Sequence, residues 1–365
     1  MAGFLDLNVN RASYRACVQY QSHDALYGLA WCDRPNDLRL AVSTFIQGVY
    51  ENKLKILQPG ATKMMQVCEV DHPYPPTKVM WSPHSFQSTL ATEHIATSAD
   101  YLRLWSVTDE GIALRAVVYT KSEYATCAPL TSLDWNRTKP EMIGTSSIDT
   151  TCTIWDLNNI TAPMQQIIAH DAEVYDMAFS SESNIFGSVG ADASLRVFDL
   201  RALESSSIHY ESQEGKPLLR IAWNQIDPYY VAAIVDESSH VVVLDLRNAS
   251  CPVFELSQHR KCLNSIAWST HSPYHLASVA EDCLAIIYDL SGSSSASGNV
   301  SLSNSHGCTE DVKYSTQLED SNTSEGIPTS VIFRTQSPIN QIRWCFGRPN
   351  CVSIAEDHQV YAIEL

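Results

Sequence analysis

The sequence has few charged residues, and cations are the scarcer kind. Only 18% of its 365 residues are Asp, Glu, Lys or Arg, and 24 cations stand against 41 anions, which gives a formal net charge of −17. A chain with this balance lacks the broad basic surface that binding to nucleic-acid phosphates requires. We therefore expect no direct nucleic-acid partner.

Further absences narrow the class of protein. No apolar run approaches the roughly 18 residues of a membrane-spanning helix. Asp6 and Asn8 interrupt the first segment, so no signal peptide is predicted. The 11 cysteines are scattered without Cys-x-x-Cys pairs, which predicts reduced thiols rather than a disulfide scaffold. We expect an intracellular protein with no membrane partner.

What the sequence does contain is a repeat. An apolar residue followed by Trp or Phe recurs at intervals of 50, 54, 44, 44, 45 and 76 residues. The seven anchors are Trp31, Trp81, Trp135, Phe179, Trp223, Trp268 and Trp344. Most intervals are close to the roughly 40 to 45 residues of a four-stranded propeller blade. The spacing predicts an all-β fold, a seven-bladed WD-repeat β-propeller.

Polar residues recur in phase with these anchors. A His lies nine residues before the anchor in three repeats, and an Asp lies six residues before a closing aromatic in three repeats. We interpret them as hydrogen-bonding locks within blades, because buried polar groups need partners. The predicted lock residues are His170, Ser188 and Asp192, then His259, Ser278 and Asp282, and in another repeat Asp149 and Trp155. They recur blade by blade instead of converging on one cleft, which favours a structural role over catalysis.

The chain is predicted to form one propeller over residues 1–365. Strand-like segments at 14–20 and 360–365 are expected to meet in one blade, with the N-terminal strand outermost, and so to close the ring. Residues 291–328, between the sixth and seventh anchors, are Ser-rich and acidic. Such a segment buries too little apolar surface to offset its ordering, so we predict a flexible insertion. A solvated spacer is favoured over a phosphorylated or docking segment.

The familiar signatures of catalysis are missing. No Gly-x-Gly-x-x-Gly, Gly-x4-Gly-Lys-Ser/Thr, Gly-x-Ser-x-Gly or His-Glu-x-x-His motif occurs. We predict that the protein is not an enzyme and uses neither a cofactor nor a metal. An enzyme with a site in the propeller channel is the remote alternative, and it would require titratable groups from three or more blades in one pocket.

Longer strings go beyond the generic blade markers. They are DHPYPPTKVMWSP at 71–83, CAPLTSLDWN at 127–136, GTSSIDTTCTIW at 144–155, IAHDAEVYD at 168–176, SVGAD at 188–192, PLLRIAWN at 217–224 and QHRKCLNSIAW at 258–268. These strings resemble the TRANSPARENT TESTA GLABRA group, which includes a plant pigment regulator and its animal relative, the cullin-ligase-associated WD-repeat factor. The resemblance covers roughly residues 23–290 and resumes near residue 331.

The resemblance implies a non-enzymatic scaffold, a monomeric propeller within a hetero-complex of the nucleus and cytoplasm. Members of the group hold MYB and basic helix-loop-helix transcription regulators in plants. In animals they hold dual-specificity tyrosine-regulated or homeodomain-interacting protein kinases. A substrate receptor of a cullin-RING ubiquitin ligase is the alternative function. The sequence does not disclose its lineage, so the partner stays open.

Two further sets of residues are candidate contacts. Ligase receptors of this class close consecutive blades with an aromatic-Asp-x-Arg box, which 198–201 and 244–247 resemble. Arg201 and Arg247 are therefore candidate ligase-adaptor contacts, unless each arginine pairs with a neighbouring carboxylate or lies free in water.

A partner-binding rim is expected at three tyrosines, with blade core as the alternative location for each ring. These are Tyr74, Tyr101 and Tyr124. The acidic balance of the chain favours a basic partner segment, whose association would be sensitive to salt.

Overall fold

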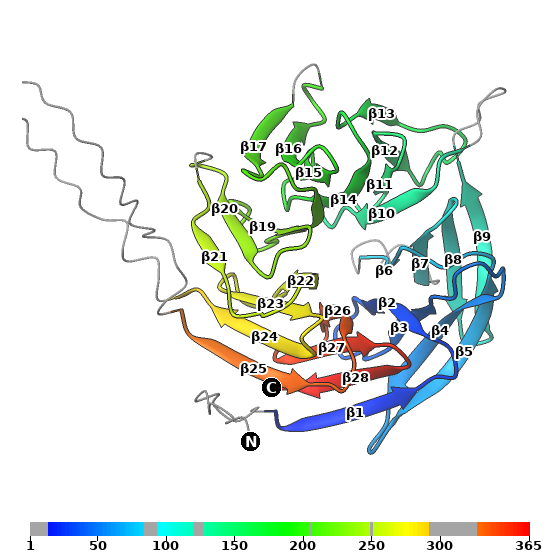
Figure 1. Ribbon diagram of the computed structural model, residues 1–365. Helices are drawn as coiled ribbons and strands as arrows, with labels where there is room; N and C mark the ends of the chain where they lie inside the picture. Colours follow the sequence, from blue (N-terminus) through cyan, green and yellow to red (C-terminus); the bar gives the residue numbers. More distant parts are fainter. Residues whose placement is uncertain (1–13, 84–92, 120–126, 204–205, 249–250, 292–326) are drawn as a thin grey trace, which may run out of the picture.

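The computed structural model describes residues 14–83, 93–119, 127–203, 206–248, 251–291 and 327–365. Within these ranges 28 strands form seven antiparallel sheets of four strands each, arranged around a ring (Figure 1). The described residues contain no helix of the length and apolarity needed to cross a membrane. The predicted all-β, seven-bladed propeller is confirmed. The predicted insertion at 291–328 falls outside the described residues except at its ends.

The first four blades take their strands in chain order from the channel outward. Blade 1 contains β2 (Leu26–Trp31), β3 (Leu40–Thr44), β4 (Asn52–Pro59) and β5 (Met64–His72). Blade 2 contains β6 (Lys78–Trp81), β7 (Glu93–Ser98), β8 (Leu102–Thr108) and β9 (Gly111–Val118). Blade 3 contains β10 (Leu130–Trp135), β11 (Met142–Ser147), β12 (Thr151–Asp156) and β13 (Gln165–Ile168). Blade 4 contains β14 (Val174–Phe179), β15 (Ile185–Gly190), β16 (Ser194–Asp199) and β17 (Ser207–Glu211).

The next two blades repeat this order, and the last blade is completed from the other end of the chain. Blade 5 contains β18 (Leu218–Trp223), β19 (Tyr230–Val235), β20 (Val241–Asp245) and β21 (Phe254–Leu256). Blade 6 contains β22 (Leu263–Trp268), β23 (His275–Ala280), β24 (Leu284–Asp289) and β25 (Thr329–Arg334). Blade 7 contains β26 (Ile339–Trp344), β27 (Cys351–Glu356), β28 (Gln359–Glu364) and β1 (Ala16–Gln21).

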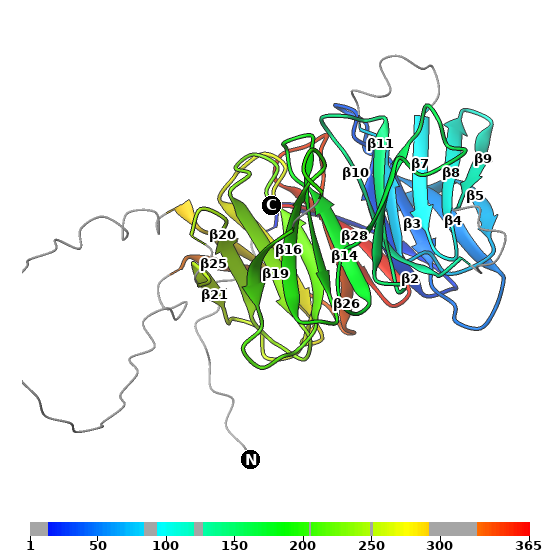
Figure 2. The same ribbon diagram turned by 90° about the horizontal axis from the view of Figure 1, so that it is seen from above.

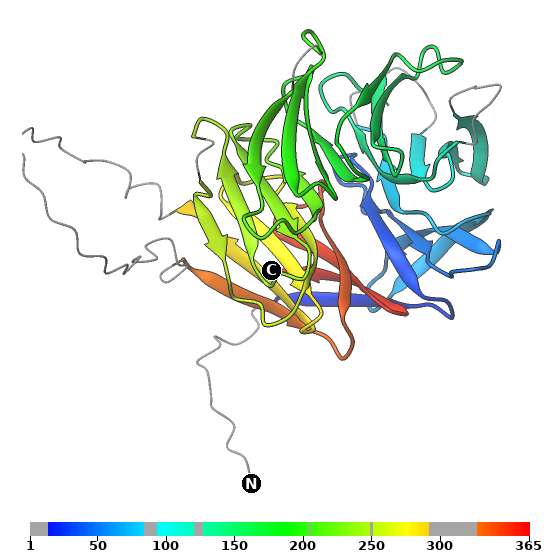
Figure 3. The same cartoon turned by 45° about the horizontal axis from the view of Figure 1, so that its top comes forward.

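The ring closes where the two ends of the chain meet. β1 pairs antiparallel with β28 over six residues, from Ala16 opposite Glu364 to Gln21 opposite Gln359. Figures 1 and 3 show the blue N-terminal strand lying beside the red C-terminal strands. β1 is therefore the outermost strand of blade 7, as the strand-like segments at the two ends predicted. This pairing covers the outer edge of β28 and provides hydrogen-bond partners for its backbone N–H and C=O groups.

The core lies between neighbouring blades. Each sheet packs its branched and aromatic side chains against the next sheet, and the perpendicular view in Figure 2 shows the sheets standing side by side. The anchor indoles reinforce two of these contacts near the channel. Trp268 Nε1 donates to the carbonyl of Ala222 at 3.0 Å, and Trp344 Nε1 donates to that of Ala267 at 3.0 Å. These two anchors thus tie blades 6 and 7 to the blades that precede them.

Blade 4 contains the hydrogen bonds expected of its lock. His170 Nδ1 lies 2.8 Å from Asp192 Oδ1, and His170 Nε2 lies 2.7 Å from Ser188 Oγ. Asp192 also accepts a hydrogen bond from the backbone amide of Asp171 at 3.2 Å. The three side chains join the segment before the innermost strand to the turn between the second and third strands.

Blade 6 has the same arrangement with one addition. His259 Nδ1 lies 3.0 Å from Asp282 Oδ2, and His259 Nε2 lies 2.7 Å from Ser278 Oγ. Ser278 Oγ in turn donates to the Tyr288 hydroxyl at 3.2 Å. The closing aromatic residue on the third strand therefore takes part in the network.

In blade 3 the two predicted lock residues, Asp149 and Trp155, bind different partners. Trp155 Nε1 donates to Thr145 Oγ1 at 3.1 Å, so the closing indole binds the second-strand hydroxyl. Asp149 instead accepts hydrogen bonds from the amide and the hydroxyl of Thr151, at 3.1 and 2.7 Å, within an exposed turn. Its carboxylate serves the turn, because the described part of this blade supplies no imidazole to meet it.

A buried imidazole at the end of blade 1 lies next to the closing tryptophan of blade 2. His72 Nε2 lies 3.0 Å from Thr97 Oγ1, and Trp105 Nε1 donates to the same hydroxyl at 2.9 Å. The Asp of this blade, Asp100, binds the guanidinium of Arg103 and leaves His72 without a carboxylate partner. Burial, followed by the nearby Arg103 charge, lowers the pKa of His72 to about 4.

This imidazole generates a pH-dependence of stability. The unfolded chain takes up the proton at the ordinary histidine pKa, about 6.5, whereas the folded protein resists it until near 4, so stability falls as the pH decreases through this window. We expect His72 to remove about 2 kcal/mol of unfolding free energy between pH 7 and pH 5. Urea unfolding at both pH values should show a smaller decrease in His72→Gln. His23→Gln, at the almost fully exposed position before the first anchor, should keep the full decrease. An equal decrease in His72→Gln and the unsubstituted protein would contradict the assignment.

Candidate partner-binding surfaces

The antiparallel order of each blade gives the ring two faces. The innermost strand begins at one face and ends beside its Trp or Phe anchor at the other. We call these the start face and the anchor face. The third strand runs parallel to the first, so turns between the second and third strands lie on the start face. Residues that follow the third strand lie on the anchor face.

Four tyrosines gather on the start face of blades 1 and 2. Tyr50 lies between β3 and β4, Tyr74 between β5 and β6, Tyr101 between β7 and β8, and Tyr119 directly after β9. The rings of Tyr50 and Tyr74 meet edge to face at 5.2 Å, and those of Tyr101 and Tyr119 lie 5.5 Å apart. We call these four residues the tyrosine patch.

The tyrosine patch is open to solvent. Tyr50 is 70% exposed, Tyr119 42% and Tyr74 38%. The pKa of Tyr74 is raised by Tyr50 first, then by burial, with smaller contributions from Asp100 and from Tyr101 of the other ring pair. Exposed tyrosines offer a large contact area at a small loss of side-chain freedom, and each carries a hydroxyl for a hydrogen bond. This surface can bind a protein segment.

The expected rim overlaps this patch in part. Tyr74 and Tyr101 belong to it, and neither ring lies in the blade core. Tyr124 lies outside the described residues. Sequence reasoning missed Tyr50 and Tyr119, which flank strands that were readable in the sequence. Their position in a turn and at a strand end was the available signal.

The two arginine boxes lie together on the anchor face. Arg201 follows β16 and Arg247 follows β20, so the boxes close the third strands of neighbouring blades 4 and 5. Their side chains are 64% and 53% exposed. A partner that spans two adjacent blades could contact both residues.

Each of these arginines binds the aspartate of its own box. Arg201 Nε donates to Asp199 Oδ1 at 2.9 Å, and Arg247 Nε donates to Asp245 Oδ1 at 2.8 Å. The Arg247 guanidinium also lies 4.7 Å from the ring centre of Tyr229. Pairing with a neighbouring carboxylate is therefore the state of both side chains. Exposed pairs of this kind contribute little to stability because solvent screens them, so a partner can compete for the guanidinium.

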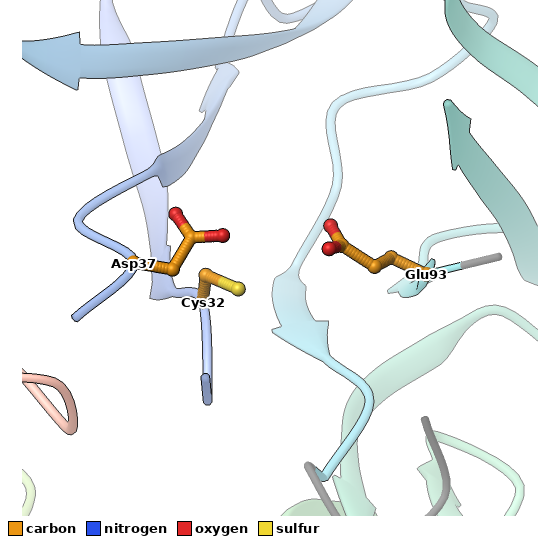
Figure 4. Close-up of side chains that lie close together, drawn as sticks. All are labelled: Cys32, Asp37 and Glu93. Atoms are coloured by element: carbon orange, nitrogen blue, oxygen red, sulfur yellow. The ribbon is translucent and has the colours of Figure 1, made fainter. Parts of the chain in front are cut away.

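A thiol and two carboxylates converge between blades 1 and 2. Figure 4 shows Cys32 and Asp37 facing Glu93, and their ligand atoms lie within 4.8 Å of one another. Arg39 donates to Glu93 at 2.6 Å and to Asp37 at 3.0 Å, while Arg34 binds Glu93 at 2.8 Å. Burial raises the pKa of Cys32 to about 12, which keeps the thiol protonated and a poor metal ligand. Two guanidiniums already neutralise the carboxylates, so the group joins the blades through ion pairs.

The channel is lined by two rings of side chains that sequence reasoning missed. In a strand, residues two apart share a face, so positions three and one before each anchor both point into the channel. The position three residues before the anchor holds Gly28, Lys78, Ser132, Asp176, Arg220, Ser265 and Gln341. The position one residue before the anchor holds Ala30, Met80, Asp134, Ala178, Ala222, Ala267 and Arg343. Ten of these residues border a cavity of about 490 Å³. The anchors were sufficient to locate both rings.

This cavity joins titratable groups from five blades, which is the arrangement that the enzyme alternative required. They are Lys78, Asp134, Arg137, Asp176, Arg220 and Arg343. Among the described lining residues there is no imidazole or thiol. Burial raises the pKa of Asp176, but Lys78, Arg220 and hydrogen bonds outweigh it and hold the pKa below its ordinary value. Asp176 is therefore a weak base, and the cavity offers charge more than proton transfer.

Comparison with known proteins places this geometry in a family. The WD domain, G-beta repeat model matches residues 161–199 and 250–289. The chain is 45% identical over 278 residues to the DDB1- and CUL4-associated factor 7 homolog of Dictyostelium discoideum, covering 74% of this chain and 84% of that protein. It is 32% identical over 360 residues to WD repeat-containing protein YPL247C of Saccharomyces cerevisiae, covering 88% and 67%. The cullin-ligase-associated branch of the expected resemblance is supported, and the plant branch stays a prediction.

The ion-pair group between blades 1 and 2 yields a prediction about stability. Glu93→Gln leaves Arg34 and Arg39 with less compensation in a partly buried site. We expect the free energy of unfolding to fall by about 1–3 kcal/mol in urea titration, less than for a fully buried pair because both arginines reach solvent. Glu110→Gln, in the exposed turn between β8 and β9, removes the same charge and should change it little. Equal effects of the two substitutions would contradict the proposed role of Glu93.

Proposed function

The chain belongs to the WD-repeat family that includes the DDB1- and CUL4-associated factor 7 homolog, and we propose that it is a non-enzymatic scaffold that assembles protein complexes. The observation that carries this proposal is the tyrosine patch, an exposed aromatic surface on the start face of a rigid ring. A rigid receptor pays little entropy on binding, which leaves more of the contact energy for affinity. The protein would act in the nucleus and the cytoplasm.

The partner proposed for the tyrosine patch is a protein kinase of the dual-specificity tyrosine-regulated type or a MYB or basic helix-loop-helix regulator. The patch favours a linear segment, because its four rings come from four separate loops and form an extended surface. The chain as a whole carries a net charge of −17, and Asp100 beside the rings is already paired with Arg103. A basic segment with an apolar side chain between the rings would match the aromatic surface and the overall charge.

Removing two rings tests this role. In the double variant Tyr50→Ser, Tyr74→Ser the exposed edge-to-face pair is lost, and a tyrosine that acts as a hot spot contributes about 2 kcal/mol or more to binding. We expect at least a tenfold decrease in the kinase or regulator that co-purifies with the tagged protein at near-physiological salt, quantified by mass spectrometry.

The matched control for that experiment is Tyr274→Ser. Tyr274 is also exposed but lies in the loop between β22 and β23, on the anchor face of blade 6. It should leave partner recovery unchanged. Recovery from the double variant equal to that from the control would place the partner elsewhere on the ring. Absence of any stoichiometric partner from the unsubstituted protein would instead reopen the enzyme alternative.

A second role, as substrate receptor of a cullin-RING ligase, is favoured by the arginine boxes and by the relative whose name states an association with DDB1 and CUL4. We propose that Arg201 and Arg247 contact the ligase adaptor. Because the boxes lie on the anchor face and the tyrosine patch on the start face, both partners could bind one ring at the same time. A scaffold with this layout would present a bound protein to the ligase.

The arginine boxes can be tested separately from the tyrosine patch. Arg201→Ala with Arg247→Ala should decrease co-purification of DDB1 at least tenfold, because two planar donors are lost, while the partner of the tyrosine patch stays bound. Lys216→Ala with Arg260→Ala removes two cations from other surfaces and serves as the charge-matched control. Unchanged DDB1 recovery from the Arg201 and Arg247 variant would contradict the receptor role without affecting the scaffold proposal.

A further inference from the structure

The channel has an excess of positive charge in a protein that is otherwise acidic. Lys78, Arg137, Arg220 and Arg343 line its cavity together with two carboxylates, Asp134 and Asp176. Arg137 is paired with Asp33 at 3.0 Å. The whole chain carries a net charge of −17, so the local excess does not follow from composition. Cations gathered in an enclosed space raise each other's energy unless anions neutralise them.

One carboxylate is fully used by its own neighbours. Asp176 Oδ1 accepts from Ser132 Oγ at 2.5 Å and from Lys78 Nζ at 3.1 Å. It also accepts from the amide of Met177 at 2.9 Å, and Oδ2 accepts from the amide of Ile221 at 3.1 Å. Asp176 therefore neutralises Lys78 and has little capacity left for a guanidinium.

The second carboxylate is a weak counter-ion. Asp134 Oδ2 accepts a hydrogen bond from the amide of Phe179 at 2.6 Å. Burial raises the pKa of Asp134, with the charge of Lys78 acting against that effect. Burial makes the negative charge of Asp134 costly in this site, so Asp134 compensates the arginines poorly.

The two arginines bind neutral oxygens only. Arg220 donates to the Tyr27 hydroxyl and to its own strand's backbone, both at 2.8 Å. Arg343 donates to the carbonyl of Ile342 at 2.9 Å and to Ser265 Oγ at 3.4 Å. Neither guanidinium has a carboxylate within 4.0 Å among the described residues. Both guanidiniums therefore retain N–H groups that have no acceptor among the described residues.

Each guanidinium is enclosed by protein but reaches the cavity. Both side chains keep partial accessibility although they stand on innermost strands, because they border the channel. Burial lowers the pKa of Arg343; the charge of Asp176 acts against that effect, and the charge of Arg220 adds to it. The channel carboxylates compensate the two guanidiniums only from a distance, without forming an ion pair with either among the described residues. An anion bound directly between the two cations would lower the cost of enclosing them.

We propose that the channel binds a small phosphate-class oxyanion through Arg220 and Arg343, with Ser265 as a neighbouring hydroxyl donor. Planar guanidiniums bind phosphate oxygens through paired hydrogen bonds, which a chloride ion cannot match. The cavity of about 490 Å³ lies in the range of small-ligand sites, and it accommodates more than a single phosphate. Free pyrophosphate or the phosphate groups of a small metabolite fit this chemistry. The site is independent of the tyrosine patch and the arginine boxes.

Calorimetry with sodium pyrophosphate and with inorganic phosphate, each at constant ionic strength, tests the proposal on the full chain. We expect saturable one-to-one binding of pyrophosphate that is tighter than that of phosphate. Arg220→Gln and Arg343→Gln should each weaken binding at least tenfold, whereas Arg260→Gln, an exposed arginine before β22, should stay within twofold of the unsubstituted protein. Absence of saturable binding, or equal affinity in all variants, would overturn the proposal.

Hydrogen exchange on the unsubstituted protein keeps the test decisive if a channel variant does not fold. Pyrophosphate should slow exchange of amides in β18 and β26, which carry Arg220 and Arg343, and leave β13 and β17 at the rim unchanged. Protection confined to other strands would refute the channel site. A phosphoserine peptide that protects β18 and β26 when pyrophosphate does not would also refute a free small anion and would assign the site to a protein partner.

Discussion

Contact between neighbouring sheets is the interaction on which this protein depends. A single four-stranded blade has two apolar faces and cannot bury either one alone, so each blade requires a neighbour on both sides. The requirement is met for all seven blades only when the ring closes, and the pairing of β1 with β28 closes it. Ends of the chain that are more than three hundred residues apart thereby complete one sheet. Any change that opens blade 7 would expose the faces of blades 1 and 6 as well.

The closed ring also decides where polar groups can be buried. On the outside of the core, an imidazole, a hydroxyl and a carboxylate can satisfy one another within a blade, as in blades 4 and 6. In blades 2 and 3 the indole N–H of the closing tryptophan is satisfied by a threonine hydroxyl of the second strand. Near the channel axis, a buried polar side chain has to find its hydrogen-bond or ion-pair partner on another blade. Lys78 and Asp176 pair across the channel although they are 98 residues apart.

Rigidity and separation of surfaces follow from the same architecture. The start face collects loops that precede or join strands, and there the tyrosine patch forms. The anchor face collects the ends of first and third strands, and there the arginine boxes and the cavity lie. A ring with two opposite faces can hold two proteins that do not contact each other. The channel adds a third surface whose charge is opposite to that of the chain as a whole.

The sequence alone determined the repeat, the number of blades, the closure of the ring and the members of two locks, because anchor spacing and strand alternation are local properties. It also contained both channel rings, since their positions follow from the anchors. Only the tertiary structure decided which loops meet. Tyr50 and Tyr119 join Tyr74 and Tyr101 because neighbouring blades curve around one axis, and no local pattern encodes that curvature. Likewise Asp149 binds its own turn, and the arginines of the two boxes bind their own aspartates. Such choices depend on which partner lies within about 3 Å in the folded ring, and sequence order does not specify that distance.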